Sequence, residues 1–147
     1  MVSVQVDWIC DALSQLFPEH EPLYRRNTLL LKEQLKSLDL HLHKLLEKTQ
    51  GNAVIVSHDS FGYFCNAYGL IQISVEVEGK SPRPQTLSKA LKEARDNTVR
   101  CVLSQPQYNN AGAERLANIL DLKVYMVDPL SPHYLDEMRH LGEVIAR

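Results

Sequence analysis

The chain has 147 residues, of which 44% are hydrophobic and 23% charged, and its formal net charge is −2. This length and composition are typical of a globular protein with its own hydrophobic core. The weak negative charge argues against nucleic acid and against an anionic membrane surface as partners. No apolar run reaches the ~20 residues of a membrane-spanning helix, and the first residues lack the pattern of a signal peptide.

The three cysteines, Cys10, Cys65 and Cys101, are widely spaced and odd in number. They therefore predict neither a disulfide framework nor a CxxC metal site. Each lies among apolar residues, so we interpret all three as small buried hydrophobic residues.

The first third of the sequence predicts two helices. Residues 4–17 have apolar side chains at helical spacing and end at Pro18. Residues 22–48 contain no glycine or proline after Pro22, and one narrow row of side chains, here called the seam, is apolar at alternating spacings of four and three. The seam comprises Tyr24, Thr28, Leu31, Leu35, Leu38, Leu42 and Leu45. A helix of this length spans about 40 Å.

The remaining sequence alternates between strand and helix patterns. Apolar runs at 53–57, 71–77, 100–104 and 123–127 predict strands, and amphipathic segments at 61–70, 85–96, 111–120 and 133–146 predict helices. A turn rich in glycine and proline occupies 78–84. Helical connections predict an α/β fold with a four-stranded, mainly parallel sheet and helices on both faces. We divide the chain into 1–51, a helix plus the long linker helix, and 52–147, the α/β lobe.

Two residues at predicted strand ends are candidates for a site. His58 follows the first strand and Asp128 follows the last, and the carboxyl ends of parallel strands share one edge of a sheet. Imidazole and carboxylate suit Zn²⁺ or a similar divalent ion, although two ligands leave a tetrahedral site half built. The alternative is structural: Asp59 or Ser60 caps the next helix, His58 is a polar residue with its hydrogen bonds satisfied, and Asp128 is a turn residue before Pro129.

Two other functions fit the residues less well. An enzyme on this sheet would use His58 and Asp59 for acid–base work, but the sequence has no GxSxG, GxGxxG or P-loop motif. An interaction domain would use the seam of the long helix as a dimerisation surface.

Five segments, in order, resemble a known family: YRRNTLLLKEQLKSLD, SHDSFGYFCNAYGL, SPRPQTL, VLSQPQYN and VDPLSPHYLDEMRHL. Nearly the whole chain is similar to the C-terminal half of the solute-binding proteins that supply zinc, manganese or iron to bacterial ABC importers. Such proteins have two α/β lobes joined by a long helix, and each lobe gives two ligands to a metal between them. The resemblance implies that His58 and Asp128 are metal ligands and that 22–48 is the interlobe helix.

The resemblance also sets further expectations. The first lobe with its two histidines is missing, which suggests a truncated or split product, and Gln105 stands where relatives often have glutamate. We expect a non-enzymatic transport lobe whose partners are a divalent metal, an importer permease and the missing N-terminal lobe. Zinc is favoured over manganese or iron, bound weakly or not at all by this fragment, with His58 facing solvent. The expected location is periplasmic or extracytoplasmic at the membrane, and a partly bare seam suggests self-association.

Overall fold

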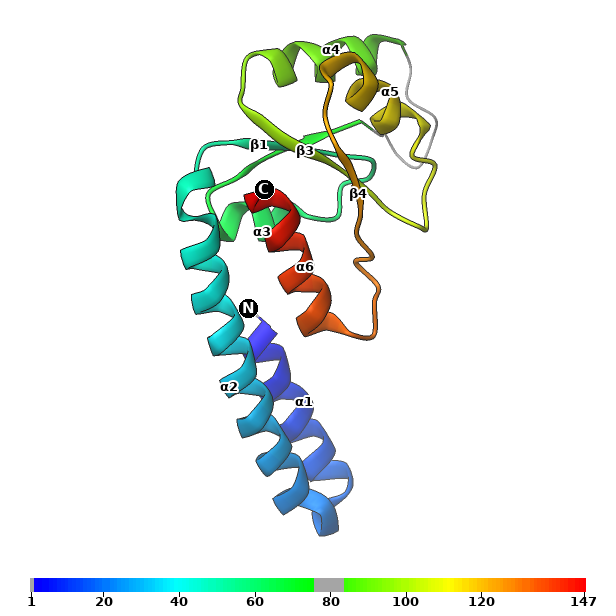
Figure 1. The fold of residues 1–147 in the computed structure, drawn as a ribbon. Coiled ribbons are helices and arrows are strands. Elements are labelled where there is room, and N and C mark those ends of the chain that lie inside the picture. The colour runs from blue at the N-terminus through cyan, green and yellow to red at the C-terminus, as the bar shows by residue number, and fades with distance from the viewer. Residues whose placement is uncertain (1, 76–83) are drawn as a thin grey trace. The chain divides into compact units, whose positions relative to one another are not determined.

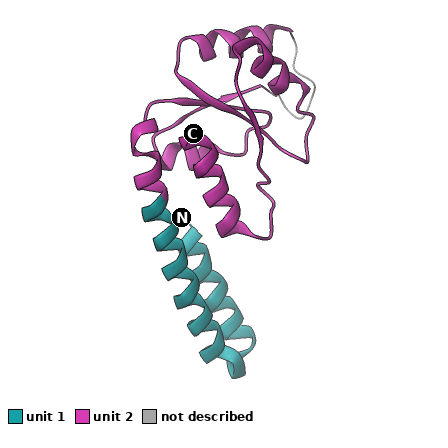
Figure 2. Ribbon diagram, in the orientation of Figure 1, with its two compact units in different colours: residues 1–41 teal, residues 42–147 magenta. Residues whose placement is uncertain are grey.

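The computed structural model describes residues 2–75 and 84–147. The chain forms two compact units, Met1–His41 and Leu42–Arg147 (Figure 2). The division falls inside the long helix. The boundary predicted after residue 51 is the point where the helical segment ends and the sheet begins, and it differs from the division between the two compact units. As a boundary between lobes of the protein it stays a prediction.

The first unit is built from α1 (Val2–Leu16), the short 3-10 helix η1 (Pro18–His20) and the first part of α2 (Glu21–Leu46). Both predicted helices are confirmed to within two residues at each end. Within this unit α1 and α2 lie side by side (Figure 1), and the carboxylate of Asp7 accepts hydrogen bonds of 2.7 and 2.8 Å from Lys32 Nζ. In the described part of the chain, no helix has the length and apolarity needed to cross a membrane.

The seam is confirmed as the least exposed side of α2. Leu35 and Leu38 are buried in the first unit, and Leu42 is buried in the second. His43, in the last turn of α2, is exposed on another side of the helix. After α2 the chain passes through η2 (Glu47–Thr49) into the sheet.

The second unit contains a four-stranded sheet formed by β1 (Ala53–Val56), β2 (Ile71–Ser74), β3 (Val99–Ser104) and β4 (Val124–Met126). The strand order is β2-β1-β3-β4, and all three pairings are parallel. The predicted parallel sheet is therefore confirmed. Every carboxyl end lies at one edge of the sheet, with β1 and β3 in the middle.

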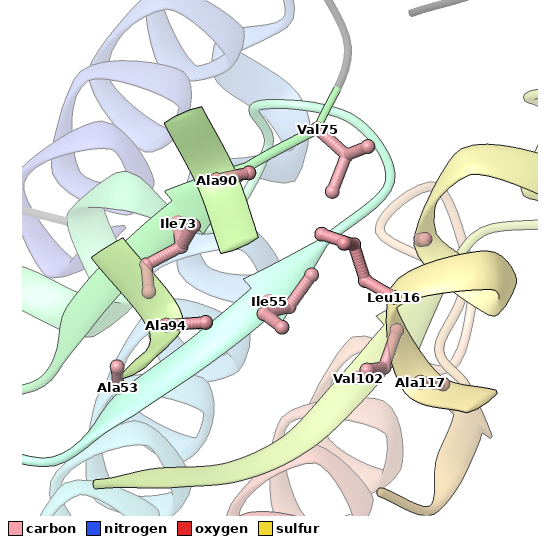
Figure 3. Packing of buried hydrophobic residues seen from close by; sticks show 10 residues of the cluster. Ala53, Ile55, Ile73, Val75, Ala90, Ala94, Val102, Leu116 and Ala117 are labelled. Atoms are coloured by element: carbon pink, nitrogen blue, oxygen red, sulfur yellow. The ribbon is translucent and has the colours of Figure 1, made fainter. Parts of the chain in front are cut away.

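Helices cover both faces of this sheet, as predicted. The helices α4 (Pro84–Arg95) and α5 (Ala111–Leu120) lie on one face, and α3 (Gly62–Ala67) and α6 (Tyr134–Ala146) lie on the other (Figure 1). All four residues of β1 are buried, which explains its continuous apolar sequence. Side chains of one face form a core with α4 and α5 (Figure 3), comprising Ala53, Ile55, Ile73, Val75, Ala90, Ala94, Val102, Ala113, Leu116 and Ala117.

The prediction for 71–77 is confirmed in its described part. Ile73 and Val75 are 1% exposed and point into the core, and the main-chain N–H of Val75 donates to Val56 O at 3.1 Å. Residues 76–77 and most of the predicted turn at 78–84 lie outside the described residues.

The cysteine interpretation is confirmed. Cys10, Cys65 and Cys101 are buried free thiols. Burial raises the pKa of Cys65 to about 11 and that of Cys101 to about 12. These two thiols are protonated at neutral pH, and a zinc ligand must be a thiolate, so both are poor candidates for metal binding.

Candidate metal site

His58 lies just beyond the carboxyl end of β1. The preceding residue, Ser57, is buried and extends the strand by donating its N–H to Leu103 O at 3.1 Å. The His58 side chain is half-buried, and its imidazole stacks on the Tyr108 ring with a centroid distance of 3.8 Å and an interplanar angle of 14°. The expectation that His58 faces solvent is thus only partly correct, because one ring face is covered.

The turn that carries His58 is held from the neighbouring strand β2. The Gln72 carboxamide accepts a hydrogen bond of 3.0 Å from Phe61 N and donates from Nε2 to the Asp59 carboxylate. Helix α3 begins after Phe61 with no side-chain cap. The alternative in which Asp59 or Ser60 caps this helix is therefore wrong, since Asp59 instead binds the side chain of an adjacent strand.

On the other side, Gln105 holds the same turn from the end of β3. This side chain is 0% exposed. Its Nε2 donates to the His58 carbonyl oxygen at 3.0 Å, and its Oε1 accepts from Ser60 Oγ at 3.3 Å. A neutral amide satisfies both bonds because it has a donor and an acceptor. Two glutamines from the flanking strands thus fix the main chain around His58.

Asp128 lies beyond the carboxyl end of β4, after the buried Val127. Its Oδ1 accepts hydrogen bonds from Leu130 N at 2.9 Å and from Gln107 Nε2 at 2.5 Å, and its main-chain N–H donates to Glu137 Oε1 at 2.7 Å. The turn alternative is correct to this extent, since the bond to Leu130 is an Asx turn. Both bonds use Oδ1, so among the described residues Oδ2 is the oxygen left for a ligand.

The structure brings the two candidate residues to the same edge of the sheet. One strand, β3, separates β1 from β4, so the two strand ends are about 10 Å apart at ~4.8 Å per strand. The loop after β3 lies at the same edge, because Gln107 donates a hydrogen bond to Asp128. Within residues 2–75 and 84–147, no group of three or more His, Cys, Asp or Glu side chains is placed to hold a metal.

Sequence reasoning missed three residues around the pair. Tyr108 covers His58, Gln107 binds Asp128, and Glu137 of α6 fixes the Asp128 main chain. The segment QPQY was recognisable as a strand end, but which side chains turn toward the edge depends on the loop conformation, which spacing does not encode.

The fold and the site together define a class: a parallel α/β lobe that carries a histidine and an aspartate, two residue types that bind divalent metals, at the carboxyl edge of its sheet. The model of the family "Zinc-uptake complex component A periplasmic" matches residues 1–147. The chain belongs to this zinc-uptake family, which confirms the resemblance drawn from the five segments.

Individual relatives agree with this assignment. A Chlamydia trachomatis protein provisionally described as metal-binding is 27% identical over 146 residues, which are 99% of this chain and 53% of that protein. The high-affinity zinc uptake system protein ZnuA of Haemophilus influenzae is 27% identical over 124 residues, 83% of this chain and 37% of that protein. A crystal structure of ZnuA superposes with a TM-score of 0.92 at 28% identity, covering 99% of this chain and 57% of that one. The chain spans about half the length, or less, of these proteins.

Proposed function

We propose that this chain is the C-terminal metal-binding lobe of a zinc-uptake solute-binding protein and that it contributes half of the zinc site. The family model over all 147 residues carries this proposal. The carboxyl-edge position of His58 and Asp128 supports it, because ligands of open α/β sheets collect at that edge.

In this proposal zinc is the cargo, held by the His58 imidazole and by Oδ2 of Asp128. Nitrogen and oxygen ligands of this kind suit Zn²⁺, while manganese and iron remain alternatives that favour more oxygen ligands or a different geometry. Two ligands do not complete a tetrahedron, so an N-terminal lobe of the same protein supplies the others. The fragment alone is expected to bind zinc weakly.

The chemistry of the proposed site is reversible coordination rather than catalysis, so we propose that the protein is not an enzyme. A coordinating imidazole must be neutral, and protons therefore compete with zinc and weaken binding as the pH falls. The proposed partner is the permease of an ABC importer, and the proposed location is periplasmic or extracytoplasmic at the membrane. The name of the family supports the location with the word periplasmic, and it supports a membrane partner only in that it describes a component of a zinc-uptake complex.

A matched pair of histidine variants tests the ligand assignment. We expect His58→Ala in the two-lobed protein to lose most of its Zn²⁺ affinity, because removing one of four ligands opens the tetrahedron. His43→Ala is the control, since His43 is exposed on α2 and its ring contacts the edge of Tyr68 at a centroid distance of 4.9 Å. Calorimetric Zn²⁺ titration measures both. Retention of full affinity by His58→Ala would contradict the assignment.

A further inference from the structure

The loop between β3 and α5, residues 105–110, contacts both proposed ligands. Tyr108 stacks on the imidazole of His58 at 3.8 Å and 14°. The adjacent residue, Gln107, donates from Nε2 to Oδ1 of Asp128 at 2.5 Å. Two consecutive side chains of one loop therefore touch two residues that lie 70 positions apart in sequence.

The loop itself is held in one conformation by its own hydrogen bonds. Asn110 Oδ1 accepts from Gln105 N at 3.0 Å, and Asn110 Nδ2 donates back to Gln105 O at 2.9 Å. The main-chain N–H of Tyr108 also donates to Gln105 O, at 3.3 Å. Gln105 is buried and bonded to the His58 carbonyl, so the base of the loop and the His58 turn form one connected assembly.

The contacts of Tyr108 and Gln107 do not use the atoms that would bind a metal. A stacked ring covers the face of an imidazole, whereas a metal binds the lone pair of a nitrogen in the ring plane. Stacking thus restricts rotation of the His58 ring without blocking coordination. On Asp128, Gln107 and the Leu130 N–H both bond to Oδ1, so the two hydrogen bonds restrain the carboxylate through the oxygen that is not proposed as the ligand.

We propose that Gln107 and Tyr108 are positioning residues that orient Asp128 and His58 for the metal before it arrives. This inference rests on the proposed function. Outer residues that orient metal ligands reduce the rotamer freedom lost on binding, and their removal typically lowers metal affinity about 10- to 100-fold. The loop therefore sets zinc affinity without itself supplying a ligand.

The test is a calorimetric Zn²⁺ titration of the two-lobed protein that contains this chain, together with an NMR spectrum of the His58 ring protons recorded before zinc is added. We expect Tyr108→Ala and Gln107→Ala each to raise the apparent Kd for Zn²⁺ about 10- to 100-fold. Tyr108→Phe keeps the stacked ring and should stay within about twofold of the unchanged chain. Before zinc is added, Tyr108→Ala should also remove the ring-current shift that the stacked tyrosine imposes on the His58 protons, while Tyr108→Phe keeps it.

Matched controls come from exposed residues of the same lobe. Tyr63→Ala and Gln85→Ala remove the same chemical groups from exposed positions outside the loop at 105–110 and should leave the Kd unchanged. If His58→Ala abolishes the zinc response but Tyr108→Ala and Gln107→Ala titrate like the unchanged chain, the positioning role is wrong and the proposed function stands. If His58→Ala leaves the zinc affinity intact, or the unchanged two-lobed protein shows no zinc response, the proposed function is wrong and the positioning role falls with it.

Discussion

Gln105 is a neutral side chain at a fully buried position next to the candidate site. Its amide donates to the carbonyl oxygen of His58 and accepts from the hydroxyl of Ser60. The family resemblance implies that relatives often have glutamate where this chain has Gln105. In this chain the hydrogen bonding is matched to an amide, since a carboxylate cannot donate to the His58 carbonyl.

We therefore expect Gln105→Glu to lower the free energy of unfolding at neutral pH by about 1–3 kcal/mol, the cost of a buried group without its partner. Burial favours the protonated carboxyl, which can donate as the amide does, so the deficit should shrink as the pH is lowered. Urea denaturation at pH 7 and pH 5 measures it. The control Gln85→Glu, at an exposed position, should change stability by less than about 0.5 kcal/mol. Equal stability of the two variants at pH 7 would contradict the argument.

At the scale of single residues, the sequence predicted that His58 and Asp128 lie at the same edge of the sheet, because a parallel sheet aligns its strand ends. It did not predict the stacking of Tyr108 or the hydrogen bond of Gln107. Those contacts depend on backbone dihedral angles within the loop at 105–110, which the order of residue types leaves open.

At the scale of elements, α6 packs closely on the end of α2 within the second unit. A Cβ placed on Gly142 of α6 would overlap Leu42 Cδ2 and would lie 3.4 Å from Leu45 Cδ2. Leu42 is 2% exposed, so it has little space into which to move. The seam of α2 and the limits of α5 were predictable from the spacing of apolar residues. The close packing at Gly142 was not, because it depends on the distance between two helices, for which the sequence has no signal.

We expect Gly142→Ala to destabilise the protein by about 1 kcal/mol. Overpacking costs about 1–3 kcal/mol, and it exceeds the gain of up to ~1 kcal/mol from the better helix propensity of alanine. Gly62→Ala in α3 is the control, because among the described residues its new Cβ would meet only the Gln72 side chain, at 3.9 Å. That variant should be neutral or stabilised. Chemical denaturation of the pair measures the difference, and a Gly142→Ala protein as stable as the unchanged chain would show that Leu42 moves aside freely.

At the scale of the whole molecule, the two units differ in how well their apolar residues are covered. The second unit buries most of the core, although it also exposes Tyr63 at 78% and Leu130 at 74%. The first unit has few buried residues and exposes a series of large apolar side chains on α1 and α2, among them Trp8 at 69%, Leu16 at 71% and Leu29 at 66%. Large exposed apolar residues in one region are typical of surfaces that another part of a protein covers. Their exposure fits a chain that spans about half of its relatives, and self-association of the fragment through them stays a prediction.

The fold was predictable almost entirely, because apolar periodicity and breakers marked each element and helical connections required parallel strands. Only half of the candidate site was predictable, since the ligands proposed from the other lobe are not in these 147 residues. The central claim is that His58 and Asp128 form an incomplete zinc site that a second lobe completes.

Calorimetric Zn²⁺ titration of the 147-residue chain and of the two-lobed protein that contains it, under identical buffer and pH, tests this claim most directly. We propose two ligands in this chain and four in the two-lobed protein. We therefore expect weak binding by the chain and binding tighter by at least about a hundredfold in the two-lobed protein, the effect of completing the tetrahedron. Equally tight binding by both would contradict the claim, because a lobe that holds zinc tightly alone needs no ligands from another.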